Sequence, residues 1–267
     1  MKYLPIRDAA ADVRFDRFVR ILQARGVAVN EQTKLLDFGC GSGHLVKAAL
    51  ARGVDAYGSD VDFDHPSYDQ TILDEFKAQD RVRSIEVERR SKAAPRVIGL
   101  SPSSSDYYRI PFDDDTFDVV ISDMVLEHVG NYDEMVRELH RVLKPGGSFL
   151  HFFPPPLSLL EGHTKIPFGA AFHPDWYLKL LSHAGVRMWH QKGKSAQESF
   201  QWTRDYLNSD RINYLSKADV IRAFQSSFDV AFVESELFKI HPKARVFLHP
   251  ALYRNFQGRI LFGTRKT

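Results

Sequence analysis

The stretch LLDFGCGSGHL, residues 35–45, constrains the fold more than any other part of the chain. An apolar run leads directly into a loop in which Gly39, Gly41 and Gly43 occupy alternate positions. Glycine tolerates the positive φ angles that a tight turn needs, and the following HLVKAALARG is typical of a helix that ends at Gly53. We therefore predict a strand, a tight turn and a helix, with backbone N–H groups of the turn close to a ligand.

The spacing of these glycines argues against a dinucleotide as that ligand. The dinucleotide fingerprint G-x-G-x-x-G needs its third glycine for close packing of helix on strand. His44 or Val46 stands there, depending on the frame. Asp37, two residues before the first glycine, favours a ligand with a cationic part. A plain tight turn remains the alternative for this stretch taken alone.

Strands and helices alternate along most of the chain, which predicts right-handed parallel units and hence an α/β fold. The predicted strands are 34–38, 54–60, 96–100, 116–123, 148–153, 229–238 and 258–266. The predicted helices are 11–26, 44–53, 131–147, 173–185 and 216–228. Residues 62–95 are predicted to be partly helical, and 186–215 carry no clear pattern.

Composition narrows the classes of function. The 36 basic and 34 acidic residues nearly cancel, so the charge gives no reason to expect nucleic acid as a partner. Cys40 is the single cysteine, which excludes an internal disulfide and favours a reducing compartment. Without an apolar signal core or a run of about 18 apolar residues, we expect a cytoplasmic protein with no transmembrane segment. No clear linker divides the chain, so residues 1–267 are expected to form one domain.

A carboxylate ends the second predicted strand. Asp60 closes the phrase AYGSD, and a carboxylate at the tip of the strand after a glycine loop can accept hydrogen bonds from both hydroxyls of a ribose. Asp62 is a nearby competitor for this role. A solvated loop aspartate is the plain alternative, but the position one strand after the glycine loop favours ribose binding.

Together with IPFDDDTFDVVISDMVLEHVGNYDEMVRELHRVLKPGGSFL, these segments resemble the class I S-adenosylmethionine-dependent methyltransferases. Within that family, the chain is most similar to the bacterial branch whose fourth strand follows an LPF…FD phrase. The resemblance covers roughly residues 33–153. It implies a Rossmann-like, doubly wound, mostly parallel seven-stranded sheet with an elaborated C-terminal half, in which about 154–230 cover the substrate. It also implies S-adenosylmethionine as the cofactor.

The resemblance implies roles for the residues at the first two strands. Asp37, Gly39 and Gly41 would hold the methionine part of the cofactor. Gly43 would let the helix start close by, and Asp60 would bind the ribose hydroxyls.

Further along the chain, the resemblance places other cofactor contacts. Asp106, five residues before Pro111, would lie near the adenine amino group, and Tyr107 would offer its backbone N–H or its ring. Ser122 and Asp123, at the end of the fourth predicted strand, would face the methionine side. The segment SPSSSD that leads to Asp106 departs from the short glycine-containing lead-in of the family.

Histidine is the residue whose ordinary pKa suits a base at neutral pH. His163 lies in EGHTKIPFG after the fifth predicted strand, where loops of parallel sheets hold ligands. With Glu161 it is predicted to form an acid–base or substrate-contact pair, although a surface loop histidine is the alternative. His128, beside Glu127 in LEHV, recurs in the family just past the fourth strand, with helix packing as its alternative role.

These residues favour O-methylation of a small hydroxylated molecule, such as a sugar or a secondary metabolite. The end of the fourth strand reads SDMV rather than the Asn/Asp-Pro-Pro-aromatic motif of many amino-group methyltransferases. No histidine or cysteine cluster has metal-ligand spacing, so no metal is predicted. C- or N-methylation of a lipid or quinone, and a cofactor-binding partner subunit without activity, remain alternatives. The oligomeric state stays open.

Overall fold

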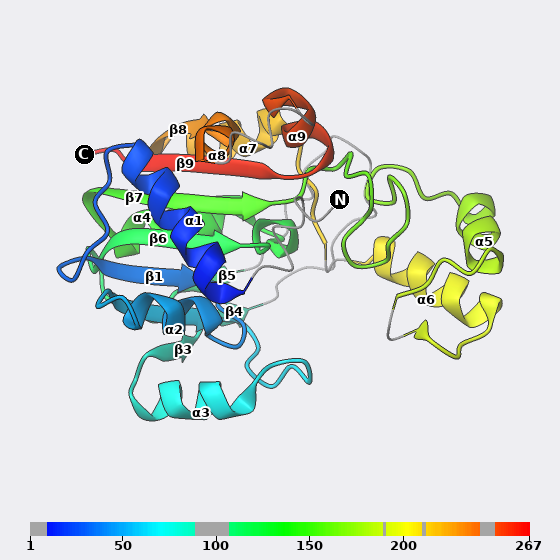
Figure 1. The fold of residues 1–267 in the computed structure, drawn as a ribbon, viewed down its shortest axis with the longest axis horizontal. Helices are drawn as coiled ribbons and strands as arrows, with labels where there is room; N and C mark the ends of the chain where they lie inside the picture. The colour runs from blue at the N-terminus through cyan, green and yellow to red at the C-terminus, as the bar shows by residue number, and fades with distance from the viewer. Residues whose placement is uncertain (1–9, 89–106, 189–190, 210–211, 241–248) are drawn as a thin grey trace.

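Seven strands form one sheet at the centre of the fold (Figure 1). The structure is a computed structural model that describes residues 10–88, 107–188, 191–209, 212–240 and 249–267. The strand order is β3-β2-β1-β6-β7-β9-β8, and β9 is antiparallel to both of its neighbours. The strands are β1 (Lys34–Phe38), β2 (Asp55–Asp60), β3 (Val82–Ser84), β6 (Phe117–Asp123), β7 (Leu143–Phe153), β8 (Phe228–Phe232) and β9 (Arg259–Arg265). This confirms the predicted doubly wound, mostly parallel seven-stranded sheet.

The edge strand of the sheet next to β2 is β3, which is not one of the predicted strands. The predicted third strand, 96–100, lies outside the described residues. β3, which pairs with β2 in the sheet, falls instead within 62–95, where no strand was predicted. β4 (Glu86–Glu88) and β5 (Tyr107–Arg109) pair with each other in a separate two-stranded ribbon. Three-residue strands such as these carry too little hydrophobic alternation to be recognised in a sequence.

Helices cover both faces of the sheet. α1 (Ala11–Ala24), α2 (His44–Leu50), α8 (Glu234–Ile240) and α9 (Pro250–Phe256) share one hydrophobic core with the sheet and with α3 (Gln70–Ala78). α4 (Tyr132–Val142) and α7 (Lys217–Phe224) cover the other face. Asn131 caps α4 as predicted, because its side-chain oxygen accepts the Glu134 N–H at 3.3 Å. The predicted end of this helix at residue 147 is wrong, because α4 ends at Val142 and β7 follows directly. Ser216 caps α7 in the same way.

The predicted strand 229–238 is wrong beyond residue 232. β8 ends at Phe232, and α8 begins at Glu234. The Glu234 carboxylate is fully buried, accepts the Ile260 N–H at 3.1 Å and pairs with Arg254 at 2.6 Å. These partners come from distant parts of the chain, so the local apolar pattern could not reveal the change from strand to helix.

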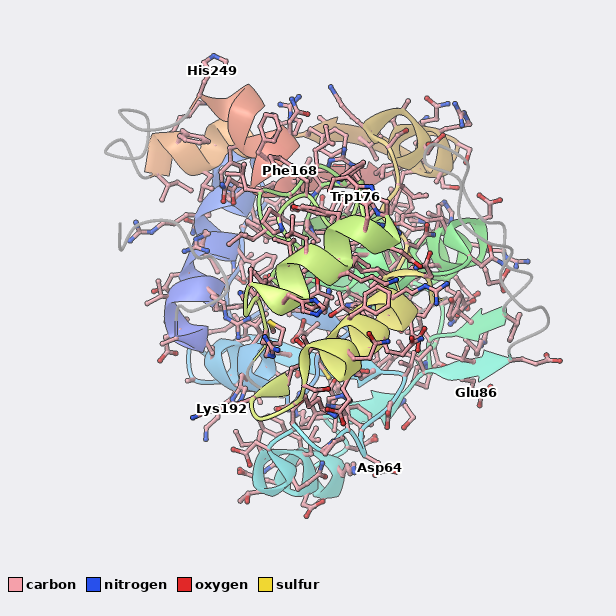
Figure 2. The ribbon with its side chains drawn as sticks, turned by 90° about the vertical axis from the view of Figure 1, so that its right-hand side faces the viewer. Asp64, Glu86, Phe168, Trp176, Lys192 and His249 are labelled. Carbon is pink, nitrogen blue, oxygen red and sulfur yellow. The ribbon has the colours of Figure 1, made fainter. Side chains whose placement is uncertain are left out.

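A small cap stands beyond the carboxyl ends of the parallel strands (Figure 1). It contains α5 (Asp175–His183) and α6 (Ala196–Leu207), which pack on each other around a core of their own. In the view of Figure 2 these two helices lie in front of the sheet. Of the segment 154–230 expected to cover the substrate, α7 packs on the sheet instead. Among the described helices, none is both long and apolar enough to cross a membrane.

Candidate active site

The strand order reverses between β1 and β6, and ligands of open α/β sheets bind outside the carboxyl ends of strands at such a point. Asp37 near the end of β1 and Asp123 at the end of β6 both lie there. Asp37 is buried, and Asp123 forms an ion pair with Arg14 of α1 at 2.6 Å. The structure therefore gathers two carboxylates and a guanidinium where the sequence motifs placed the ligand.

Glycine is required in the loop after β1 for two separate reasons. Gly39 and Gly43 both have a φ of +75°, a conformation that other residues rarely adopt. A Cβ added at Gly39 would also lie 2.3 Å from Val125 Cγ2, and one at Gly43 would lie 2.9 Å from the Phe76 ring. The predicted tight turn is present, and it packs closely against its neighbours.

Three amide groups of this loop form hydrogen bonds within the protein, and the predicted approach of the loop to a ligand stays a prediction. The N–H groups of Gly39 and Cys40 donate to the Ser59 carbonyl at 2.7 and 3.1 Å. The Gly41 N–H donates to Asp60 Oδ2 at 2.8 Å. The loop is therefore fastened to the end of β2.

The Asp60 carboxylate accepts hydrogen bonds from three backbone N–H groups at the end of β2 and in the glycine loop. Its Oδ1 accepts the N–H groups of Val61 and Asp62 at 2.7 and 3.3 Å, in addition to the Gly41 N–H on Oδ2. Burial raises the pKa of Asp60, and these backbone hydrogen bonds oppose that rise. The Tyr68 side chain also forms a hydrogen bond with Asp60. The contact of Asp60 with the ribose hydroxyls stays a prediction.

Asp37 is unusual because its environment disfavours the charged form. Burial raises its pKa to about 8, the negative charges of Asp123 and Asp60 add to the rise, and Arg14 opposes it. A cationic ligand group placed beside Asp37 would reverse the balance by stabilising the carboxylate.

On the other side of the switch point, Glu161 anchors the loop that follows β7. Its fully buried carboxylate accepts His163 Nδ1–H at 2.8 Å, the Tyr214 hydroxyl at 2.6 Å and the Thr164 hydroxyl at 2.8 Å. The backbone N–H groups of His163 and Thr164 also donate to it. Burial alone would raise the pKa of Glu161, but these hydrogen bonds together with the nearby His163 lower it to about 2. The predicted Glu161–His163 pair therefore exists, with Glu161 ionised and the His163 ring fixed in direction.

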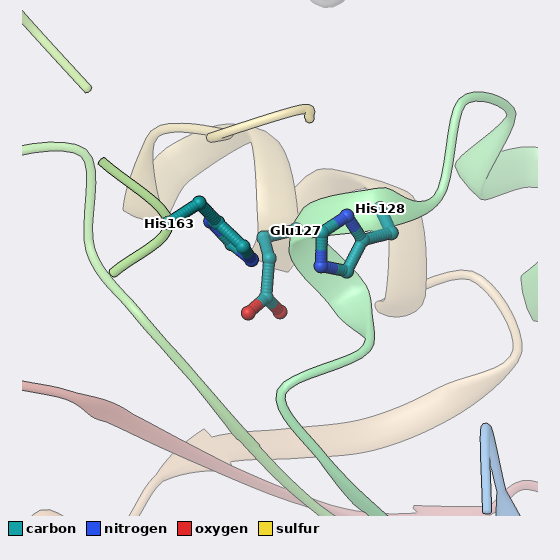
Figure 3. Close-up of side chains that lie close together, drawn as sticks. All are labelled: Glu127, His128 and His163. Atoms are coloured by element: carbon teal, nitrogen blue, oxygen red, sulfur yellow. The ribbon is translucent and has the colours of Figure 1, made fainter. Parts of the chain in front are cut away.

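His163 faces the short helix η2 (Leu126–His128), which follows β6. The His163 and His128 rings are 4.9 Å apart between centroids. Glu127, 1% exposed, has its side chain between the two imidazoles in the view of Figure 3. The two histidines that the sequence offered as competing candidates are thus neighbours.

The contacts predicted for Ser122 and Tyr107 stay predictions, and Asp106 lies outside the described residues. Ser122 is fully buried, and its hydroxyl forms a 2.6 Å hydrogen bond with Nδ1 of His151 on the neighbouring strand. Burial lowers the pKa of His151 to about 3, so this pair is neutral. Tyr107 begins β5 and lines a pocket of about 430 Å³ beside α4. Asp106 falls outside the described part of the chain.

Three residues of the site were missed by sequence analysis. Arg14 belongs to α1, Tyr214 follows the cap, and Tyr68 lies against Gly41, with its ring 3.4 Å from where a Cβ would stand. Each reaches the site from a distant segment, and none is part of a motif. The chain offers no local signal that would have found them.

Comparison with known proteins supports the class that this fold and site define. A family described as a methyltransferase domain matches residues 10–227, which is most of the chain. The chain therefore belongs to this family and is a class I S-adenosylmethionine-dependent methyltransferase by fold, as its sequence motifs implied. The cofactor of this class is S-adenosylmethionine.

Individual relatives are more distant. The chain is 46% identical over 52 residues to the mitochondrial 2-methoxy-6-polyprenyl-1,4-benzoquinol methylase of Mus musculus, covering 20% of this chain and 16% of that protein. It is 35% identical over 116 residues to methyltransferase GfsG of Streptomyces halstedii, covering 43% and 35%. A solved geranyl diphosphate C-methyltransferase from Streptomyces coelicolor superposes with a TM-score of 0.45 at 14% identity, covering 94% of this chain and 78% of that one. The chain thus matches well under half the length of these curated relatives.

Proposed function

We propose that the protein transfers the methyl group of S-adenosylmethionine to a hydroxyl of a small molecule, such as a sugar or another hydroxylated metabolite. The observation that carries this proposal is the Glu161–His163 pair, held in the loop after β7 on the acceptor side of the switch point. Asp37, Asp123 and the glycine loop would bind the cofactor on the other side. The acceptor would lie between the sheet and the cap.

The proposed reaction needs a nucleophile and a place for one proton. The hydroxyl oxygen forms a bond to the methyl carbon while the bond between that carbon and sulfur breaks. The electron pair of the broken bond stays on sulfur, and S-adenosylhomocysteine leaves. His163 Nε2 takes the hydroxyl proton, because its Nδ1–H is already donated to Glu161. The ionised Glu161 stabilises the imidazolium that results.

A second candidate function is supported by the surface of the cap. Several large apolar side chains there are exposed, including Trp176 at 63% and Leu180 at 60%. Such a patch suits an apolar acceptor, and one relative of this chain is a methylase of a polyprenyl benzoquinol. C- or N-methylation of a lipid-like or quinone-like molecule is therefore the second proposal.

We also propose a cytoplasmic location, which the lone, buried Cys40 supports.

The test is product analysis with S-adenosylmethionine labelled in its methyl group. We expect label to appear on oxygen of a hydroxylated acceptor, and calorimetry to show binding of S-adenosylmethionine and S-adenosylhomocysteine but not of NAD or NADP. Label on carbon or nitrogen would favour the second candidate. Cofactor binding without transfer to any acceptor tried would favour a partner subunit, whereas tight NAD binding without S-adenosylmethionine binding would refute the cofactor assignment.

The raised pKa of Asp37 predicts that cofactor binding releases a proton. Below pH 8 the ligand-free protein holds a proton on Asp37, and the cationic methionine part of the cofactor favours its loss. Affinity should therefore rise with pH up to about 8. The stability of the ligand-free protein should change with pH in the opposite direction. Between pH 3.8 and 8, Asp37 holds a proton in the folded state that it has lost in the unfolded chain. The free energy of unfolding therefore falls as pH rises through this range.

Titration calorimetry at pH 7 in buffers of different ionisation enthalpy measures this proton release directly. Asp37→Asn is the matched control, because the amide keeps the size of the side chain and cannot titrate. Equal proton release in the wild type and in Asp37→Asn would show that the proton comes from another group.

A further inference from the structure

Three side chains with metal-binding atoms meet at the acceptor side of the site. Glu127, His128 and His163 each present a carboxylate oxygen or an imidazole nitrogen, and these atoms all lie within 4.8 Å of one another. Figure 3 shows them converging from η2 and from the loop after β7. The sequence predicted no metal because His163 is far from the other two along the chain, and only the fold unites them.

The surroundings of His163 match those of a metal-ligating histidine. Such histidines almost always donate their other ring N–H to a carboxylate or carbonyl, which fixes the tautomer and the ring direction. His163 donates Nδ1–H to Glu161 at 2.8 Å, and Glu161 is itself held by Tyr214 and Thr164. This leaves Nε2 as the coordinating atom.

The relative placement of the two rings also fits a shared ion. Zinc–nitrogen bonds are about 2.0–2.1 Å long, so two imidazoles on one ion have ring centroids on the order of 5 Å apart. The His128 and His163 centroids are 4.9 Å apart, with their planes at 77°. Two imidazoles and one carboxylate form a donor set that suits divalent transition metals.

We propose that Glu127, His128 and His163 bind a divalent transition-metal ion, such as Zn²⁺, through one carboxylate and two imidazoles. Three protein ligands leave a position open, as in catalytic metal sites. The ion site rests on this geometry alone, whereas its role rests on the proposed function: the open position holds the acceptor hydroxyl. The ion lowers the pKa of that hydroxyl, whose proton leaves to solvent before the oxygen attacks the methyl carbon.

The test is Co²⁺ titration of the full chain after removal of metal with a chelator, followed by the visible ligand-field absorption of the bound ion. We expect saturable binding of one ion and displacement by Zn²⁺. His163→Ala and His128→Ala should each weaken Co²⁺ binding at least tenfold. Glu161→Gln should weaken it by about 10–100-fold through loss of the support to His163.

His183→Ala is the matched control, since this imidazole is exposed at the end of α5, outside the cluster. It should leave Co²⁺ binding unchanged. Because His128 is exposed, its removal should not disturb folding, which circular dichroism would verify. Absence of saturable Co²⁺ binding, or equal affinity in the wild type and His128→Ala, would overturn the metal site. Calorimetry with S-adenosylmethionine on the same metal-free protein tests the proposed cofactor separately, so the two failures are distinguishable.

Discussion

His163→Ala is expected to lower turnover by about 100- to 10,000-fold, the usual contribution of a positioned general base. The expected loss follows from the fixed direction of the imidazole, whose Nδ1–H is committed to the buried Glu161. Affinity for S-adenosylmethionine should change little, because the residues proposed to bind the cofactor lie at the ends of β1, β2 and β6. Steady-state turnover and calorimetric cofactor affinity, measured on the same preparation, check both parts.

Two variants show how His163 acts. Glu161→Gln keeps the size of the anchor but removes its charge, so we expect a smaller loss of turnover of the same kind. If His128→Ala abolishes turnover and His163→Ala does not, the assignment of the base is wrong. If neither matters, the acceptor needs no base, which would favour C- or N-methylation.

If a metal ion is bound, His163 acts as a metal ligand instead of a general base, and its removal should still lower turnover. Nε2 cannot coordinate an ion and accept a proton at the same time, so the ion would replace His163 in activating the hydroxyl. In that case turnover should fall after treatment with a chelator and return with added Zn²⁺ or Co²⁺. Turnover that is unaffected by the chelator would leave His163 as the base.

Asp60→Ala is expected to weaken cofactor binding at least tenfold. A hydrogen bond from a ribose hydroxyl to a carboxylate contributes about 1.5–3 kcal/mol, and Asp60 is the carboxylate proposed to accept it. The variant also frees the Gly41 N–H, which fastens the glycine loop to β2. Calorimetry with S-adenosylmethionine measures the loss, and circular dichroism shows whether the fold survives.

Comparison with a ligand that lacks the ribose hydroxyls separates the two contributions of Asp60. The 2′,3′-dideoxy form of S-adenosylhomocysteine cannot bond to Asp60, so any loss of its affinity in Asp60→Ala reports on the loop alone. Asp62→Ala is the matched control, because Asp62 was the competing candidate. Unchanged affinity in Asp60→Ala together with a loss in Asp62→Ala would move the ribose contact to Asp62.

The residues proposed to bind the cofactor could be selected from the sequence because they follow one another along the chain. The glycine loop, Asp37 and Asp60 lie at the ends of two successive strands whose apolar runs are plain in the sequence. The sequence did not predict that the loop amides of Gly39, Cys40 and Gly41 pair with Ser59 and Asp60, which they do because an N–H buried beside a strand end must find a partner. The hydrogen-bond partner of each loop N–H depends on the tertiary packing.

The sequence by itself determined the doubly wound sheet, the glycine turn and the pairing of Glu161 with His163, since each depends on residues near one another in the chain. Only the tertiary structure decided that His163 meets Glu127 and His128, that Arg14 pairs with Asp123, and that Tyr214 supports Glu161. Those contacts join separate segments, and their positions are set by how the helices and the cap pack on the sheet. Local patterns fix the elements, whereas burial and packing across the chain fix which side chains face each other at the site.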